Sequence, residues 1–98
     1  MKEASKNQEI LFSLGDVVAT PGALEILMKV GLHPGQLITR HVTGDWGDLD
    51  DEDKKENEVS LEKGHRLLSS YKLETGEKIW VITEGDRSVT TLLLPDEY

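Results

Sequence analysis

The sequence predicts an α+β domain, in which short helices pack on a C-terminal three-stranded antiparallel β-meander and a short strand precedes the helices. Two apolar segments in the first half of the chain begin with proline and lie close to glycine, and a charged segment without apolar residues follows them. The last third instead contains aromatic and β-branched runs separated by four-residue turns with glycine. The pattern therefore changes from helical to extended near His65.

Length and composition predict a single small domain. The chain has 98 residues, of which 37% are hydrophobic and 31% charged, and these proportions are typical of globular proteins. We expect residues 1–8, which are mostly polar, to be disordered and residues 9–98 to form the domain. Cysteine is absent, which excludes disulfides and thiolate zinc sites. Because no apolar run approaches the roughly 20 residues of a membrane span, we expect a cytoplasmic protein without membrane contact.

The first predicted element is a short strand. Apolar residues alternate with other residues from Ile10 onward and continue to Ala19, and Gly15 marks a bend in this stretch. Thr20 and Pro21 then form a helix start, because threonine can cap the first N–H groups and proline lacks only an N–H that the helix does not use there.

Two helices should follow each other around Gly31. The first ends at this glycine, and the second begins at His33 and Pro34. A helix-turn-helix for DNA is the weaker interpretation, since the candidate recognition helix opens with proline and has Arg40 as its single basic residue. We favour a plain helical hairpin packed on a sheet, with an inward face on the second helix made by Leu37, Ile38, His41 and Val42.

A tryptophan flanked by glycines follows in the segment GDWGDL, residues 44–49. The glycines allow the backbone to turn tightly around the large side chain. We favour a role for Trp46 in closing one edge of the core, with its indole N–H donating to a carbonyl or to water. The alternative is an exposed Trp46 that anchors a protein interface.

Nearly all of the charge imbalance lies between Asp45 and Glu62. This stretch contains nine acidic residues and two lysines, which gives it a net charge of −7 out of −8 for the chain. Asp50 or Asp51 can cap a helix that runs to about Lys63, where a glycine follows as the C-cap. The sequence therefore predicts an acidic helix.

The acidic helix has few means of attachment. From Asp50 to Glu58 it contains no apolar residue, so only Val59 and Leu61 can fasten it, and its first two turns should face water or a partner. A calcium-binding EF-hand begun at Asp48 fails, because an aspartate stands where the sharp turn needs glycine and a valine where the bidentate glutamate is required.

The last third predicts the three strands of the meander. These are residues 65–73, 78–83 and 88–94, which are separated by turns at residues 74–77 and 84–87. If the apolar stretch from Val89 to Leu94 lies at the edge of the sheet, it offers a template for a homodimer.

Composition and motifs argue against several classes of function. A net charge of −8 repels phosphate backbones, so we expect no direct binding of nucleic acid. His33 and His41 lack the spacing of a metal site, and no nucleotide-binding or nucleophile motif is present in the sequence. We therefore expect no metal, no cofactor and no catalytic residues, and a protein that is not an enzyme.

Two interpretations of the acidic helix remain. It is either a solvated, solubilising surface, which is the more common case, or a surface that imitates the charge of nucleic acid for a basic protein partner. As a function we prefer the second, a non-enzymatic binding protein. The residues of this partner-binding hypothesis are Trp46, Asp48, Asp50, Asp51, Glu52, Asp53 and Glu56.

A polar turn near the C-terminus supports an alternative function. Glu84, Asp86 and Arg87 bring carboxylates and a guanidinium within four residues, and His65 could lie beside them, as a small hydrolase or nuclease would need. We favour the simpler interpretation, in which an Asp–Arg pair and side-chain caps fix the hairpin.

Three segments of the chain resemble a known family. RHVTGDWGDL, which starts at Arg40, RLLSSY, which starts at Arg66, and TTLLLPDEY, which starts at Thr90, are similar to segments of small uncharacterised bacterial proteins associated with plasmids. The resemblance implies a mobile-element origin, which would suit an anti-restriction or anti-defence protein. It carries over no catalytic residues.

Overall fold

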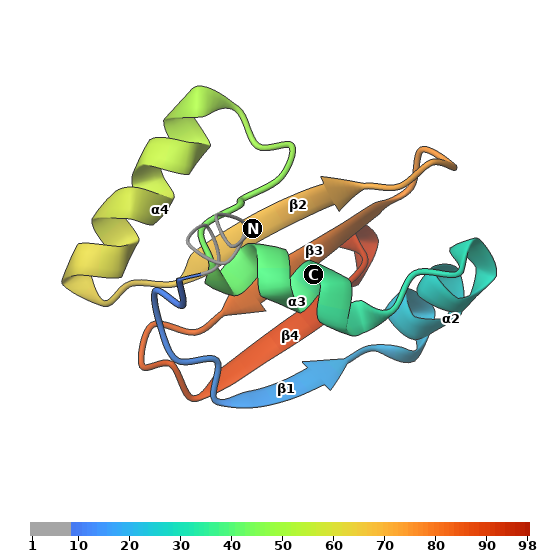
Figure 1. The fold of residues 1–98 in the computed structure, drawn as a ribbon, viewed down its shortest axis with the longest axis horizontal. Helices are drawn as coiled ribbons and strands as arrows, with labels where there is room; N and C mark the ends of the chain where they lie inside the picture. Colours follow the sequence, from blue (N-terminus) through green and yellow to red (C-terminus); the bar gives the residue numbers. More distant parts are fainter. Residues whose placement is uncertain (1–8) are drawn as a thin grey trace, which may run out of the picture.

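The computed structural model of the protein describes residues 9–98, so the disorder expected for residues 1–8 lies outside the described part. The fold is of the α+β class, as the sequence predicts (Figure 1). The elements in chain order are strand β1 (Asp16–Ala19), helices α2 (Pro21–Val30), α3 (Pro34–Val42) and α4 (Asp51–Lys63), strands β2 (Leu67–Lys72), β3 (Lys78–Thr83) and β4 (Val89–Leu93), and the 3₁₀ turn η1 (Pro95–Glu97).

The four strands form one sheet in the order β1-β4-β3-β2. β2, β3 and β4 pair antiparallel, which confirms the predicted meander. β1 joins the sheet as a parallel neighbour of β4, with Asp16 opposite Val89 and Ala19 opposite Leu92. The N-terminal strand is therefore a fourth strand of the same sheet, a placement that the apolar pattern alone does not predict.

β4 lies inside the sheet, with β1 on one side and β3 on the other. A homodimer through residues 89–94 requires this strand at an edge, and that premise is wrong because both of its sides are already hydrogen-bonded to neighbours. The outer strands of the sheet are β1 and β2.

The first strand is shorter than expected, because regular pairing begins only at Asp16. Before it, the N–H of Leu11 donates to a carbonyl at the end of α3, and the carbonyl of Leu14 accepts from a threonine hydroxyl of β4. The N–H of Leu11 and the carbonyl of Leu14 therefore do not take part in strand pairing. Gly15 makes the predicted bend: its φ is 66°, and a Cβ there would lie 2.2 Å from the carbonyl oxygen of Ser88.

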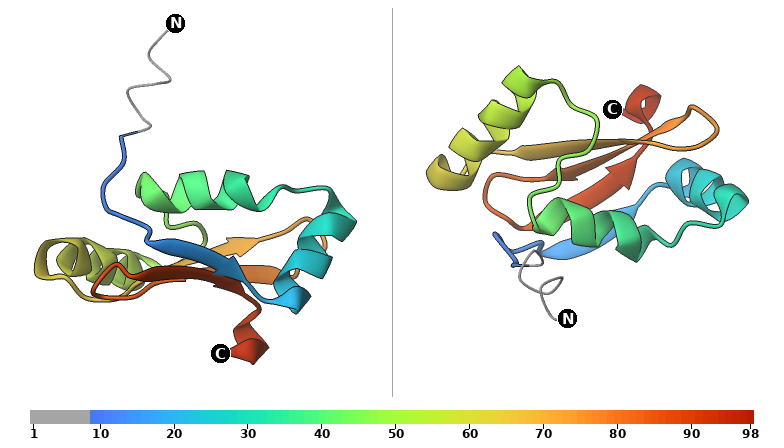
Figure 2. Two further views of the ribbon diagram at one scale, coloured as in Figure 1. Left: turned by 90° about the horizontal axis from the view of Figure 1, so that it is seen from below. Right: turned by 45° about the horizontal axis from the view of Figure 1, so that its top comes forward.

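Helices α2 and α3 cover one face of the sheet, and the core lies between these two layers (Figure 2). α4 lies beyond β2, next to the outer strand, and η1 lies on the other side of the sheet from α3 (Figures 1 and 2). No helix within residues 9–98 is long and apolar enough to cross a membrane. The buried apolar side chains of the core are Ala23, Leu27, Leu37, Tyr71, Leu73, Ile79, Val81 and Leu92.

The helix ends lie at the predicted capping residues. Thr20 Oγ1 accepts from the N–H of Ala23 (3.1 Å) at the start of α2, and Gly31 ends this helix with a φ of 72°. At the start of α3, Nδ1 of His33 accepts from the N–H of Gly35 (2.9 Å). The helical hairpin packs on the sheet as expected. The buried residues of α3 are Leu37, His41 and Val42, and Ile38 of the predicted inward face is half-buried.

Candidate functional site

The tryptophan loop, residues 44–49, closes part of the outer edge of β2. The N–H of Ser70 donates to the carbonyl of Trp46 (3.2 Å), and the carbonyl of Ser70 accepts from the N–H of Asp48 (2.7 Å). The Asp48 carboxylate also accepts from the N–H of Lys72 (2.7 Å). Gly47 permits this close approach, since a Cβ there would lie 2.1 Å from the Ser70 carbonyl oxygen. The loop therefore stands where a further strand would pair.

Asn57 closes the rest of this edge from helix α4. Its side-chain amide donates to the carbonyl of Leu68 (2.7 Å), and its side-chain oxygen accepts from the N–H of Leu68 (3.1 Å). A neighbouring strand would make the same two bonds. The expectation that apolar residues fasten α4 is wrong for Val59, which is 43% exposed, whereas Leu61 is half-buried. The buried residues of α4 are Asn57 and Ser60, which a search for apolar residues does not find.

Trp46 joins the loop to α4 and to the core. Its side chain is 4% exposed, and its indole N–H donates to the carboxylate of Glu58 (3.0 Å). The ring stacks on Phe12 and meets His41 edge-on, at centroid distances of 6.3 Å and 5.9 Å. The core-closing interpretation is confirmed, although the acceptor is a carboxylate. The alternative prediction, an exposed Trp46 that anchors an interface, is wrong. The residue can position α4, but it is not itself presented to a partner.

Arg87 fastens the far end of α4 to the polar turn. Its guanidinium donates to the carbonyl of Ser60 (3.1 Å) in α4, to that of His65 (2.7 Å) after the helix, and to two carbonyls of its own turn. The Asp86 carboxylate accepts from the N–H of Ser88 (3.0 Å), and Glu84 forms an ion pair with Arg66 (3.2 Å). The side-chain caps of the hairpin-fixing interpretation are present, but its Asp–Arg pair is wrong, because Arg87 donates to carbonyls and forms no ion pair with Asp86. His65 contacts the turn through its carbonyl.

The seven residues of the partner-binding hypothesis divide into two groups. Trp46, Asp48 and Asp50 hold the structure together, since Asp50 caps α4 by accepting from the N–H of Asp53 (2.8 Å). The other four have exposed side chains that form no ion pair with any residue in the range 9–98. We call these four residues the acidic patch: Asp51, Glu52, Asp53 and Glu56.

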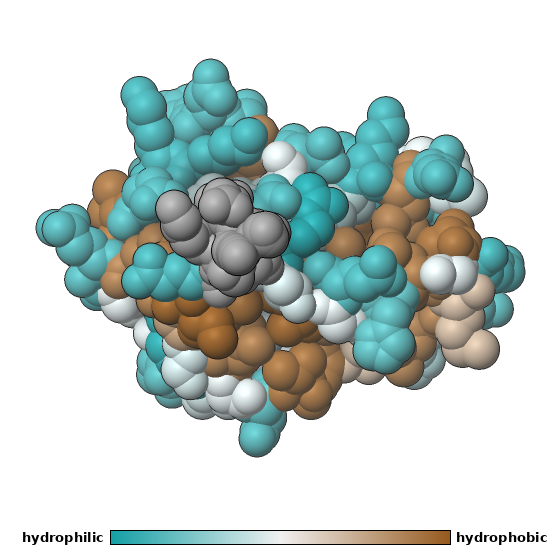
Figure 3. All heavy atoms as spheres, in the orientation of Figure 1, coloured by the Kyte–Doolittle hydropathy of each residue, from teal (hydrophilic) through white to brown (hydrophobic). Residues whose placement is uncertain are grey.

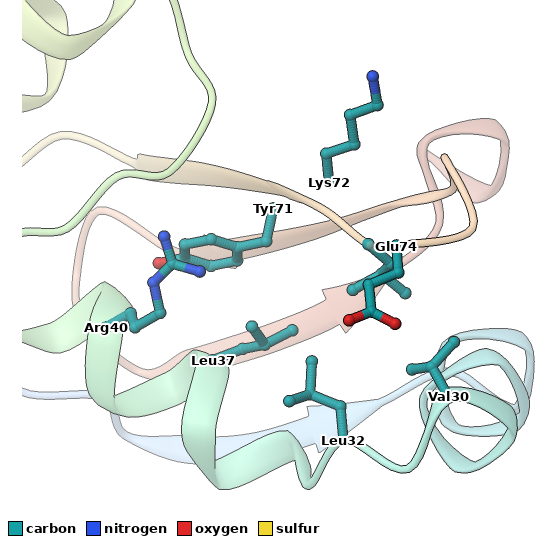
Figure 4. A pocket seen from close by; sticks show the side chains of 8 residues that line it. Val30, Leu32, Leu37, Arg40, Tyr71, Lys72 and Glu74 are labelled. Carbon is teal, nitrogen blue, oxygen red and sulfur yellow. The ribbon is translucent and has the colours of Figure 1, made fainter.

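A pocket of about 200 Å³ lies between the α2–α3 turn and the end of β2, and no sequence motif indicates it (Figure 4). Arg40 lies 4.4 Å above the ring of Tyr71 and donates to Asp45 (2.7 Å), and this hydrogen bond lowers the pKa of the Asp45 carboxyl. Glu74 and Lys72 also line the pocket, with the Lys72 side chain pointing away from it (Figure 4). Charges of both signs at the rim select no single class of ligand.

A chain of buried hydroxyl groups leads from His41 to the N-terminal segment. Nδ1 of His41 lies 2.6 Å from the hydroxyl of Ser69, and Nε2 lies 2.9 Å from the hydroxyl of Thr83. That hydroxyl lies 2.7 Å from the one on Thr90, which donates to the carbonyl of Leu14 (2.7 Å). The network joins α3, all three strands of the meander and the segment before β1.

The carbonyl at the end of this chain determines where the protons lie. Because a carbonyl only accepts, Thr90 donates to it and therefore accepts from Thr83, which in turn accepts from Nε2–H of His41. In the neutral imidazole, Nδ1 then accepts from the hydroxyl of Ser69. Burial, together with the charge of Arg87, lowers the pKa of His41 to about 4. The sequence places His41 on the inward face of its helix but gives no sign of these polar partners.

The comparisons with known proteins leave the site to be judged by its geometry. No family model, no curated protein and no solved structure matches the chain. Within residues 9–98, no group of three or more histidine, aspartate or glutamate side chains is placed to hold a metal ion. The candidate site is therefore the acidic patch, on a helix that is attached through Asn57, Glu58 and Ser60.

Proposed function

We propose that the protein is a non-enzymatic binding module that presents the acidic patch of α4 to a basic protein partner. The observation that carries the proposal is the manner in which α4 is attached. Polar contacts at Asn57, Glu58 and Ser60 hold its inner face, while the four carboxylates of the patch are exposed and form no ion pair within residues 9–98, not even with Lys54 and Lys55 of the same helix.

The packing of α4 supports a role beyond filling the core. A helix that only covered a sheet would bury an apolar stripe, but none of the first six residues of α4 is buried. The helix dipole accounts for acids in the first turn, yet its effect falls off within that turn and does not account for Glu56. An acidic surface that is held rigid before binding loses little conformational entropy when a partner arrives.

The partner that suits this surface is a protein whose own surface binds phosphate groups. Rows of carboxylates attract the lysine and arginine residues that line nucleic-acid-binding grooves, and they also steer such proteins during encounter. In the more specific form of the proposal, α4 imitates the charge of nucleic acid as an anti-restriction or anti-defence decoy. A mobile-element origin of the chain would suit this role.

Affinity capture from the native cell tests the proposal. The full chain is compared with a variant that carries Asp51→Asn, Glu52→Gln, Asp53→Asn and Glu56→Gln, which removes four charges and keeps the side-chain shapes. The unchanged chain should retain a basic protein at low salt and release it at high salt. Since exposed ion pairs contribute about 0.2–1 kcal/mol each, loss of all four should weaken binding by about 0.8–4 kcal/mol, which is roughly fourfold to several-hundredfold.

A matched control separates the position of the charges from their number. Changing Glu9, Glu25 and Glu62 to Gln and Asp96 to Asn removes four exposed charges outside the acidic patch, so this variant should still capture the partner. If the patch variant captured the same protein undiminished, the proposal would be wrong. An equal loss in both variants would also contradict it, because net charge alone would then determine binding.

A further inference from the structure

The two edges of the sheet differ. β2 is closed by the tryptophan loop and by Asn57, whereas β1 has no strand on its outer side within residues 9–98. At the two ends of β1, the N–H groups of Asp16 and Thr20 donate to carbonyls of the β4 segment. Because backbone groups of alternate residues point to opposite sides of a strand, the N–H and C=O groups of Val17 and Ala19 point outward.

Apolar side chains line this open edge. Val17 is 48% and Val18 47% exposed, and the segment that leads into β1 adds Leu11 at 43% and Ile10 at 70%. Figure 3, in the orientation of Figure 1, shows brown apolar surface toward the lower side of the molecule, where β1 lies, interrupted by white and teal atoms at the margin itself. A strand with unpaired backbone groups and apolar side chains on both faces is a template for another strand.

The distribution of charge favours a second copy of this chain over other occupants. The acidic patch lies on α4 beyond β2, at the opposite edge of the sheet (Figure 1). Three strand spacings of about 4.8 Å separate β1 from β2. This separation exceeds the screening length of about 8 Å at physiological ionic strength. Two copies joined at β1 would therefore keep their acidic patches apart, at the outer ends of one continuous sheet.

The residues of β1 also fit antiparallel pairing with themselves. When Val17 lies opposite Val17 of the second copy, the outward N–H and C=O groups of the two residues pair with each other. Asp16, the single charged residue of β1, then lies opposite Val18, so no two carboxylates face each other. Along β1, a basic peptide could form an ion pair with this one carboxylate alone, so charge does not favour such a peptide as the occupant.

We propose that β1 is a homodimerisation edge, at which a second copy adds its own β1 antiparallel and extends the sheet. The strand is four residues long and offers few hydrogen bonds, so the association is weak and depends on concentration. This edge is separate from the acidic patch, and removal of the patch charges leaves the pairing intact.

Sedimentation velocity over a concentration series, from low micromolar to submillimolar, tests this proposal on the full chain. The apparent mass should rise from 10.9 kDa toward twice that value. Val17→Lys places a charge on each side of the pairing and should keep the chain monomeric. Met28→Lys makes the same change on α2, at a side chain that is 79% exposed, and should associate as the unchanged chain does. Circular dichroism confirms that both variants are folded.

Single cysteines give a second measurement that does not depend on the lysine variants. The chain contains no cysteine, so Val17→Cys introduces a unique thiol that the pairing brings next to its copy. Under mild oxidation it should form a disulfide-linked dimer at least tenfold faster than Met28→Cys. The proposal is overturned if the unchanged chain stays monomeric throughout the concentration series. This holds also if a peptide of another protein is found to bind at β1 instead. Association undiminished by Val17→Lys overturns it equally.

Discussion

At the scale of single residues, His41 is a group whose protonation the fold opposes. The side chain is fully buried, and both ring nitrogens already have hydroxyl partners. A second proton on the ring would force the hydroxyl of Ser69 to turn away from Nδ1 and would place a positive charge near Arg87. Burial and this neighbouring charge lower the pKa of His41 from 6.5 to about 4.

We therefore expect the free energy of unfolding to decrease as the pH falls from above 6.5 to about 4. The folded pKa is lower than the unfolded one, so the unfolded chain takes up the proton first and gains stability relative to the fold. The shift in pKa corresponds to about 3 kcal/mol of stability. This contribution is fully present at a pH above the pKa of the unfolded state, and it is lost as the pH falls through the pKa of the folded state. Urea unfolding at a series of pH values measures this loss.

Two variants assign the loss to His41. His41→Gln should remove the pH dependence in this range, whereas His65→Gln, at an exposed position, should retain it. Asp45 contributes at lower pH, because its pKa is lowered from 3.8 and its stabilising effect is lost only as the pH falls below that value. If His41→Gln kept the slope of the unchanged chain between pH 6.5 and 4, another group would be responsible.

At the scale of elements, the ends of the helices follow from local sequence, but their attachments do not. Thr20, Gly31 and Gly64 act within one helical turn, so the sequence is sufficient to predict them. The pairing of Asn57 with Leu68 depends on which strand lies at the edge, and that is a property of the assembled sheet. The position of β1 beside β4 is also a property of the assembled sheet, because the two strands come from opposite ends of the chain. The local sequence therefore does not predict it.

The candidate site was predictable in its charge but not in its geometry. The absence of apolar residues correctly indicates that the first turns of α4 are exposed, and the glycines around Trp46 correctly indicate a buried ring. The acceptor on Glu58 and the donation from Arg87 to Ser60 join segments that are distant along the chain. Such contacts require the fold, since nothing in the local pattern distinguishes these residues from solvated ones.

Asn57 should contribute to stability through its two hydrogen bonds to the backbone of Leu68. Asn57→Ala leaves the N–H and the carbonyl of Leu68 without partners at a partly buried edge, which should cost about 1–3 kcal/mol of unfolding free energy. Hydrogen exchange of the Leu68 amide should also become faster, because α4 loses a main attachment to the sheet. Glu56→Ala on the exposed side of the same helix is the control and should change stability by less than about 0.5 kcal/mol. Equal effects of the two substitutions would mean that Asn57 does not hold the helix.

At the scale of the whole molecule, the two ends of the sheet have opposite character. Beyond β2 stands a helix with polar attachments and with carboxylates that form no ion pair within residues 9–98, and at the other end β1 has exposed valines and backbone groups that pair with no strand of the described part of the chain. A contact through the first end gains from opposite charges, whereas a contact through the second end has to overcome the net charge of −8 on each copy. Salt should therefore act on the two contacts with opposite sign.

A single salt series tests this difference. Raising the ionic strength shortens the distance over which charges act, so capture of the basic partner by the acidic patch should weaken. Self-association through β1 should become stronger over the same series, because the repulsion between two acidic copies is screened while burial of Val17 and Val18 is not reduced. Sedimentation velocity and affinity capture at matched salt concentrations measure the two effects. A dimer that dissociated as salt increased would be held by charged contacts, and β1 would then not be its interface.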